Sequence, residues 1–290
     1  MVDLVSSQDL GEDGQYALVA KLDSVKIFAQ LLKSINFRER STWFVSANGI
    51  KVTVEDAKSV QTNAFIKSDI FQEFVLQPGK GDEEGGDDLS FSVSLNVVLE
   101  CLNMFGGVGE SGGGDSPNLK ICYSGYGTPL VLLLEEGGVV TDCRIKTREA
   151  EECLDFNFAN ANIVSKIIMN SDHLKDVLNE LDSSSETIQF RVSPSDQSFQ
   201  ISTRGPAGEC EVTIPRDSEM VEHFTCEATS QASYKLSMLR HGIKPLGLSD
   251  KVSVRMDERE FLCLQYMVRT EEGPAFLEFY CAPEEEEPER

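Results

Sequence analysis

Apolar and polar residues alternate over many short stretches of this chain, and a two-residue period is typical of strands with one buried face. In the first half, alternation and β-branched residues predict strands at 16–21, 43–45, 49–54, 64–66, 89–93, 119–123 and 130–134. In the second half, they predict strands at 163–169, 187–192, 198–203, 211–214, 251–256, 261–268 and 275–280. Asn48 and Gly49 predict a hairpin turn. We therefore expect a chain rich in antiparallel sheet.

A longer period of apolar residues predicts helices at 25–35, 95–105, 172–181 and 236–244. The first has the clearest pattern, because Asp23 and Ser24 supply a cap and one stripe contains Val25, Phe28, Leu31, Leu32 and Ile35. Ser171 is expected to precede the third helix in the same way. Four helices among many strands predict an α+β fold.

The two halves of the chain repeat the same order of elements. A shift of 146 positions aligns the apolar stripes of the first and third helices, with Phe28, Leu31, Leu32 and Ile35 on Leu174, Val177, Leu178 and Leu181. A shift of 141 positions aligns the second and fourth helices, with Leu95, Val98 and Leu102 on Leu236, Leu239 and Ile243. The sequence therefore predicts a tandem duplication.

The net charge of −23 argues against a protein that binds nucleic acid through its whole surface. Much of the acid lies in 78–88 and 106–117, which are rich in glycine and expected to be surface loops, and in 284–290, an expected disordered tail. A local basic face can coexist with such a charge. The N-terminus lacks a signal-peptide pattern and no stretch is long and apolar enough to span a membrane, so we expect an intracellular protein without membrane contact.

The residues that usually carry chemistry are scattered. The 8 cysteines include no C-x-x-C pair and the 3 histidines stand apart, so we expect no metal site, no disulfide framework and no cofactor. A formal G-x-G-x-x-G at Gly107, Gly109 and Gly112 follows a predicted helix and precedes a strand, the reverse of a dinucleotide site. No Walker A sequence is present. We therefore expect no catalytic residues and no ATP chemistry in this chain.

The order of elements and several strings resemble the sliding-clamp superfamily, which includes proliferating cell nuclear antigen. These strings are WFVSANGIKVTVEDAKSV at 43–60 and FYCAP, followed by acids, at 279–283. The strings NGIKVTVEDAKSVQTNAFI (48–66), IFQEF (70–74), GYGTPLVLLLEEGGVVTDCRI (125–145) and FLCLQYMVRTEEG (261–273) resemble the Rad-one subunit family of the nine-one-one DNA-damage checkpoint clamp. The two acidic glycine-rich segments are longer than that family's pattern.

The resemblance implies two similar domains, with antiparallel sheets on the outside of a ring and four helices lining its interior. The domains would span 1–135 and 153–283, with a connecting loop at 136–152 and the tail at 284–290. Lys26, Gln30 and Lys33 share the polar face of the first helix, which could be an ordinary solvated face. In a clamp that face meets DNA, so the resemblance implies DNA-facing cations at Lys26, Lys33, Lys175, Arg240 and Lys244.

The run PLVLLLE at 129–135 could be a buried central strand. In a clamp it would instead be an edge strand that pairs with another subunit. The resemblance thus implies subunit contacts at Leu130, Leu132 and Leu134, with a complementary edge at Val212 and Ile214. The connecting loop could merely join the domains, but in clamps it borders a pocket for partner peptides. That pocket would contain Val139, Val140, Cys143, Ile145, Tyr280, Ala282 and Pro283.

The resemblance implies a non-enzymatic, nuclear subunit of a heterotrimeric clamp that recruits checkpoint signalling and repair proteins. Expected partners are a Rad-nine-like subunit, a Hus-one-like subunit, an ATP-dependent clamp loader and double-stranded DNA bound without sequence specificity. One alternative is a 3'-to-5' exonuclease, which would need carboxylates that converge on metal ions. Another is a homotrimeric replication clamp, which would need complementary edges in one chain.

Overall fold

The computed structural model describes residues 16–77, 88–104, 116–156, 158, 160–181, 184–206, 208–271 and 273–284. Almost all of the two acidic glycine-rich segments, the G-x-G-x-x-G and the tail beyond Glu284 lie outside this part. The chain separates into a first unit, 1–54 with 64–153 and 270–275, and a second unit, 55–63 with 154–269 and 276–290. In the described part, no helix is long and apolar enough to cross a membrane.

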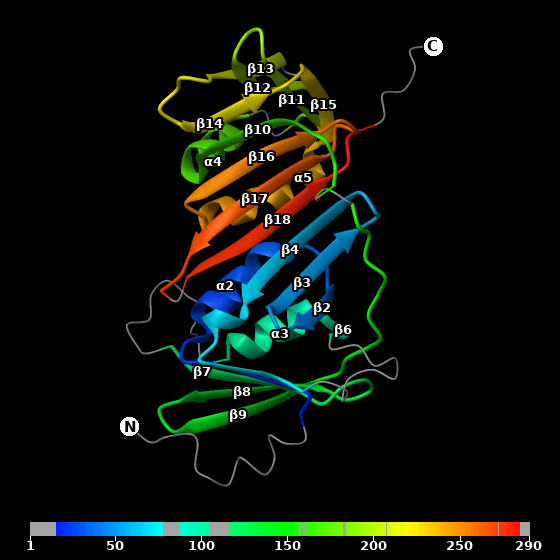
Figure 1. Cartoon of the computed structure of the whole chain (residues 1–290), viewed down its shortest axis with the longest axis vertical. Helices are drawn as coiled ribbons and strands as arrows, with labels where there is room; N and C mark the ends of the chain where they lie inside the picture. Colours follow the sequence, from blue (N-terminus) through cyan, green and yellow to red (C-terminus); the bar gives the residue numbers. More distant parts are fainter. Residues whose placement is uncertain are drawn as a thin grey trace. The chain divides into compact units, whose positions relative to one another are not determined.

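The first half of the chain contains nine strands and two α-helices in the described residues (Figure 1). They are β1 (Leu18–Leu22), α2 (Val25–Ile35), β2 (Arg40–Ser46), β3 (Gly49–Asp56), β4 (Val60–Lys67), β5 (Glu73–Leu76), β6 (Leu89–Ser94), α3 (Leu95–Leu102), β7 (Asn118–Tyr123), β8 (Leu130–Glu136) and β9 (Val139–Ile145). A short 3-10 helix, η1 (Ser68–Ile70), follows β4.

The second half repeats this order. Its elements are β10 (Ile163–Asn170), α4 (Ser171–Glu180), β11 (Thr187–Ser193), β12 (Ser198–Gly205), β13 (Gly208–Pro215), β14 (Val221–Cys226), β15 (Ser230–Lys235), α5 (Leu236–Ile243), β16 (Lys251–Asp257), β17 (Leu262–Arg269) and β18 (Pro274–Cys281). A 3-10 helix, η2 (Lys244–Gly247), follows α5. Each half has one strand, one helix, five strands, one helix and three strands, so the predicted duplication is confirmed.

The sheets repeat as well as the element order. The first half has strand runs β5-β1-β7-β8-β9 and β4-β3-β2-β6, and the second has β14-β10-β16-β17-β18 and β13-β12-β11-β15. These runs correspond position by position, and neighbouring strands such as β1 and β7, or β10 and β16, pair in antiparallel fashion. The duplication therefore makes β9 equivalent to β18 and β4 equivalent to β13.

Local sequence explains where the helices begin. The Ser24 hydroxyl accepts a hydrogen bond from the Lys26 N–H at 3.3 Å, so α2 begins as its cap predicts. The third predicted helix begins one residue early, because Asn170 and not Ser171 is its cap. The Asn170 side chain accepts hydrogen bonds from the backbone N–H groups of Asp172 (2.9 Å) and His173 (3.3 Å).

Aromatic side chains connect the two sheets within the first unit. Trp43 of β2 stacks on Phe91 of β6 with ring centroids 5.7 Å apart, and Phe91 lies 4.3 Å from Tyr123 of β7. Helix α3 contacts β9 of one run and β2 and β6 of the other. In the second unit, a Cβ atom on Gly242 would lie 2.8 Å from the Phe279 ring, so a glycine lets α5 approach β18 closely.

The predicted hairpin turn is displaced by one residue. Ser46 pairs with Gly49, so Ala47 and Asn48 form the turn and Gly49 begins β3. Gly49 has φ +131°, and a Cβ atom there would lie 2.2 Å from the Ile66 carbonyl oxygen. Both observations require glycine at this position, for its conformation and for the close approach of β4.

Four strands were not predicted: β5, β9, β14 and β15. Their sequences are short or carry many polar side chains, such as VVTDCRI in β9 and SQASYK in β15. Part of the connecting loop predicted at 136–152 is a strand instead. Residues 139–145 form β9, which pairs along β8. The connection between the two repeats therefore begins after Ile145.

Candidate nucleic-acid and protein interfaces

The predicted cations of α2 lie on its exposed side. Lys26 and Lys33 are exposed, whereas Phe28 and Leu32 are buried on the opposite side of the helix. Helix α3 packs beside α2, and the Asn36 side chain at the end of α2 donates a hydrogen bond to Asn96 of α3 at 2.9 Å. The pair of helices thus offers lysines on α2 and polar side chains on α3. Its contact with DNA stays a prediction.

The cations of the second unit differ from one another in their surroundings. Arg240 on α5 and Lys244 are exposed, but α5 ends at Ile243, so Lys244 begins η2 and does not extend the helix as predicted. Lys175 on α4 is half-buried, and its Nζ lies 3.3 Å from the position of a Cβ atom on Gly247 of η2. Lys175 therefore packs along η2 and is the weakest of the predicted DNA contacts.

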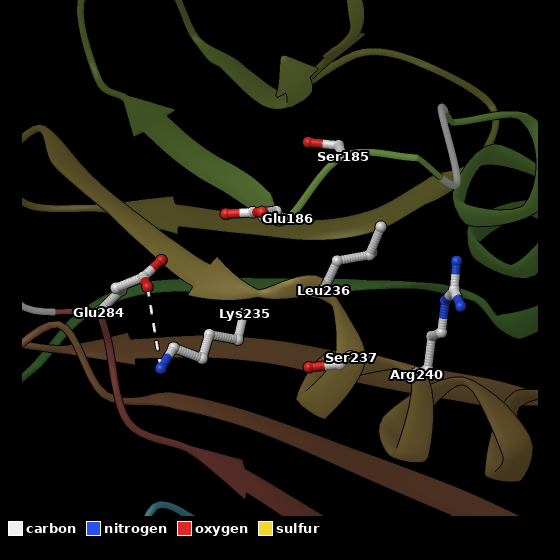
Figure 2. A pocket seen from close by; sticks show the side chains of 7 residues that line it. All are labelled: Ser185, Glu186, Lys235, Leu236, Ser237, Arg240 and Glu284. Carbon is white, nitrogen blue, oxygen red and sulfur yellow. Dashed lines mark ion pairs between the residues drawn. The ribbon is translucent and has the colours of Figure 1, made fainter. Parts of the chain in front are cut away.

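A pocket of about 330 Å³ lies at the start of α5 in the second unit. Its lining consists of Ser185, Glu186, Lys235, Leu236, Ser237, Arg240 and Glu284. Figure 2 shows Arg240 on one side and, on the other, Lys235 facing Glu284, with 4.0 Å between Nζ and Oε1. The Glu284 N–H donates to the Ser233 carbonyl at 2.7 Å, which fixes that wall. Sequence reasoning missed this pocket, apart from Arg240.

Charge in this pocket is mixed, because its lining contains the cations of Lys235 and Arg240 together with the carboxylates of Glu186 and Glu284. Among the described residues, no group of three or more His, Cys, Asp or Glu side chains is arranged to hold a metal ion.

One predicted subunit edge is a true edge and the other is not. β13 ends its strand run, with Val212 half-buried and Ile214 buried, although its contact with a neighbouring subunit stays a prediction. β8 lies between β7 and β9, so the prediction of an edge at Leu130, Leu132 and Leu134 is wrong. These three side chains are completely buried. A continuous apolar run fits a central strand, which was the open alternative.

The outer strand of that sheet is β9. Its Val139 and Val140 side chains are 60% and 53% exposed, whereas Cys143 and Ile145 are buried. An outermost strand presents backbone N–H and C=O groups that can pair with another chain, and exposed apolar side chains favour that pairing. β9 therefore replaces β8 as the candidate subunit edge of the first unit.

The residues of the predicted peptide pocket fall in two units. Val139, Val140, Cys143 and Ile145 belong to β9 of the first unit, and Tyr280, Ala282 and Pro283 belong to the second. After β9, the chain stays attached to the first unit. Ser92 and Arg148 exchange two backbone hydrogen bonds of 2.9 and 2.8 Å, and Arg40 forms an ion pair with Glu151.

Around Tyr280, the structure reveals an aromatic cluster that sequence reasoning missed. The Tyr280 ring lies 5.6 Å from the rings of both Phe156 and Phe158, and its hydroxyl donates to Glu278 at 2.8 Å. Burial raises the pKa of Tyr280, so the hydroxyl stays protonated and acts as a donor. The only sequence signal for the cluster is the pair of phenylalanines in LDFNF at 154–158.

The buried cysteines are not poised as nucleophiles. Burial raises the pKa of Cys263 and of Cys281 to about 12. Burial, together with the neighbouring Cys143, raises the pKa of Cys101 to about 11. Since the thiolate is the reactive form, the raised pKa values disfavour a nucleophilic role for these thiols near neutral pH.

Comparison with known proteins gives a consistent result along the chain. A sequence model of the family described as "Repair protein Rad1/Rec1/Rad17" matches residues 17–268. The human and mouse proteins named "Cell cycle checkpoint protein RAD1" are 48% and 47% identical over 287 residues. The alignments cover 99% of this chain in both cases, 98% of the human protein and 99% of the mouse protein.

Two more distant relatives have other names. The "DNA repair exonuclease REC1" of Mycosarcoma maydis is 20% identical, with 92% of this chain and 95% of that protein covered. The "DNA polymerase sliding clamp" of Thermococcus gammatolerans is 24% identical over 152 residues, which cover 52% of this chain and 59% of the clamp. The duplicated sheets and four helices agree with the sliding-clamp fold.

Proposed function

We propose, since the chain belongs to the Rad1/Rec1/Rad17 family of repair proteins, that it is one subunit of a heterotrimeric ring-shaped DNA clamp. The ring is loaded at DNA damage and acts as a scaffold for checkpoint signalling and repair proteins. Its other subunits are Rad-nine-like and Hus-one-like chains, an ATP-dependent loader places it on DNA, and it acts in the nucleus. The checkpoint names of the human and mouse relatives support this role.

The pairing of β18 with β4 is the observation that carries the proposal. Residues 276–281 of β18 and residues 60–63 of β4 belong to the second unit, where the two strands are neighbours in a sheet, and the Ala282 N–H donates to the Ser59 carbonyl at 2.8 Å. The duplication makes β9 equivalent to β18 and β13 equivalent to β4. In the described part of the chain, β9 and β13 end their strand runs. Each can therefore form the same kind of pairing with a neighbouring subunit.

The exposed cations support the second part of the proposal, that DNA passes through the ring. Lys26 and Lys33 on α2 and Arg240 and Lys244 on and after α5 carry flexible positive charges that can contact phosphates without reading bases. Their small number agrees with a subunit that shares DNA contacts with others. A closed ring retains DNA by topology, so a weak intrinsic affinity is sufficient.

A 3'-to-5' exonuclease is the second candidate, because the fungal relative carries that name. It would need carboxylates that converge on two metal ions. A homotrimeric replication clamp is the third, because the archaeal relative is named as a polymerase clamp and because β9 and β13 are both edges of one chain.

The purified chain by itself distinguishes these candidates. We expect light scattering to give a monomer, and we expect a labelled single strand incubated with the chain and Mg²⁺ or Mn²⁺ to stay intact. A stable self-trimer would instead indicate the replication clamp. Shortening of the strand, abolished by substitution of a single carboxylate, would indicate the exonuclease and would overturn the scaffold assignment.

A further inference from the structure

Three sulfur atoms lie together between helix α3 and strand β9 of the first unit. Cys101 lies in the last turn of α3, Met104 follows the helix, and Cys143 lies on β9. The Cys143 thiol donates to the Met104 thioether, with 3.6 Å between Sγ and Sδ. The Cys101 and Cys143 thiols are also hydrogen-bonded to each other. Two thiols and one thioether from two elements therefore form a single cluster.

The local structure directs these sulfur atoms toward one another. In the string CLNM at 101–104, the Met104 N–H donates to the Cys101 carbonyl at 3.2 Å. Such a turn places side chains three positions apart on the same side of the backbone. On β9, the Cys143 side chain is 9% exposed, whereas both neighbouring residues are exposed. Since side chains alternate along a strand, Cys143 points inward, where α3 packs against β9.

The donor set determines which class of ligand this cluster suits. Thiolate and thioether sulfur atoms are soft ligands, and they select soft cations such as Cu(I). A structural zinc site usually takes four ligands from cysteine, histidine and carboxylate side chains. Within the described ranges, no group of three or more such side chains is arranged to hold a metal ion. Cu(I) is stable with two or three sulfur ligands, so the cluster suits Cu(I) better than zinc.

The sulfur atoms need to move little to hold such an ion. Metal–sulfur bonds of about 2.3 Å in a flat, three-coordinate arrangement place neighbouring sulfur atoms about 4 Å apart. Cys143 Sγ and Met104 Sδ are already 3.6 Å apart. The Met104 side chain is 62% exposed, and methionine has three rotatable bonds. It can therefore swing outward to admit an ion from solvent and return to bind it.

We propose that Cys101, Cys143 and Met104 form a binding site for the soft monovalent cation Cu(I). The ion displaces one proton from each thiol to solvent, and the two thiolates and the thioether coordinate it. Two thiolates and one Cu(I) together carry a single negative charge, and no atom is oxidised or reduced. The bound ion connects the end of α3 to β9, the candidate subunit edge. Binding of the ion does not depend on the clamp proposal.

The test is a competition between the purified full chain and bicinchoninate, a chelator that is coloured when it holds Cu(I), in the absence of oxygen. We expect the wild-type chain to remove one Cu(I) per chain from an excess of the chelator, measured as a loss of absorbance. The variant Cys101→Ser/Cys143→Ser should bind Cu(I) at least about a hundredfold more weakly, because both thiolates are lost. Removal of no Cu(I) by the wild-type chain would overturn the proposal.

Met104→Leu keeps the test valid if the double variant does not fold. The side chain is 62% exposed and leucine has a similar volume, so the fold should be unchanged. We expect this variant to bind Cu(I) about tenfold more weakly, because a soft ligand is replaced by a hydrocarbon. An affinity equal to that of the wild-type chain would show that the thioether is not a ligand and would overturn the three-sulfur site.

Cys210→Ser/Cys226→Ser is the matched control for the double variant. Both cysteines are half-buried, and they lie on β13 and β14 of the second unit. This control should bind one Cu(I) as tightly as the wild-type chain does. Equal losses in the two double variants would show that Cu(I) binds to cysteines in general and would contradict a built site between α3 and β9.

Discussion

A chain with Val139→Lys and Val140→Lys is expected to fold normally and to be lost from the ring. The two valines are 60% and 53% exposed on the outer strand β9, so lysines there can extend into water in the isolated chain. In the ring, strand pairing along β9 would remove the two charges from water without partners. An unpaired buried charge costs about 2–5 kcal/mol, which corresponds to a loss of about 30-fold to a few thousandfold in assembly.

Light scattering of the three-subunit mixture measures this loss, and circular dichroism checks the fold. Tyr126→Lys is the control, because Tyr126 is 71% exposed in the first unit but does not lie on β9. It should assemble as the wild-type chain does. Full assembly by the double lysine variant would show that β9 is not a subunit edge.

Replacing Lys26, Lys33, Arg240 and Lys244 together by alanine is expected to weaken the binding of the assembled ring to DNA. Each phosphate contact contributes about 0.9 to the slope of log affinity against log salt concentration, so the slope should fall by up to about 3.6. At low salt, the affinity should fall at least about tenfold, because the released counterions supply most of the nonspecific binding energy. Lys175 is left unchanged, since it packs along η2.

A second quadruple variant separates these local contacts from the change in net charge. Lys58, Lys67, Lys146 and Arg148 are exposed, belong to no helix and lie outside β9 and β13, and their replacement by alanine removes the same charge. This control should keep nearly the full salt slope in a DNA-binding titration. Equal losses in the two variants would contradict the assignment of α2 and α5 as DNA-facing helices.

The sequence alone was sufficient to predict helices and strands that depend mainly on residues close together along the chain. The Ser24 cap and the apolar stripe of α2 determine that helix, and the strong β-propensity of 49–54 and 251–256 determines strands. The duplication could be recognised because the apolar stripes of the helices are similar in the two halves, although the two sequences have diverged. The position of a strand within its sheet could not be predicted from the sequence. An apolar run such as Leu130–Glu136 predicts a strand, but it does not show which strands flank it.

The candidate sites depend on contacts between distant positions, which explains the errors there. β9 looks like a polar connection until its partner β8 is known. The aromatic cluster around Tyr280 involves Phe156 and Phe158, whose only sequence signal is a pair of phenylalanines in LDFNF. The pocket of Figure 2 likewise combines Glu186, Lys235 and Glu284, which no short motif connects.

Retention of the loaded ring on closed circular DNA, compared with the same DNA after linearisation, tests the central claim most directly. A ring that encircles DNA is held by topology, so we expect it to stay on the circle in high salt, where phosphate contacts are screened. After the circle is cut, the ring should slide off the ends. Equal retention on circular and linear DNA in high salt would contradict the proposal that this chain is part of a clamp around DNA.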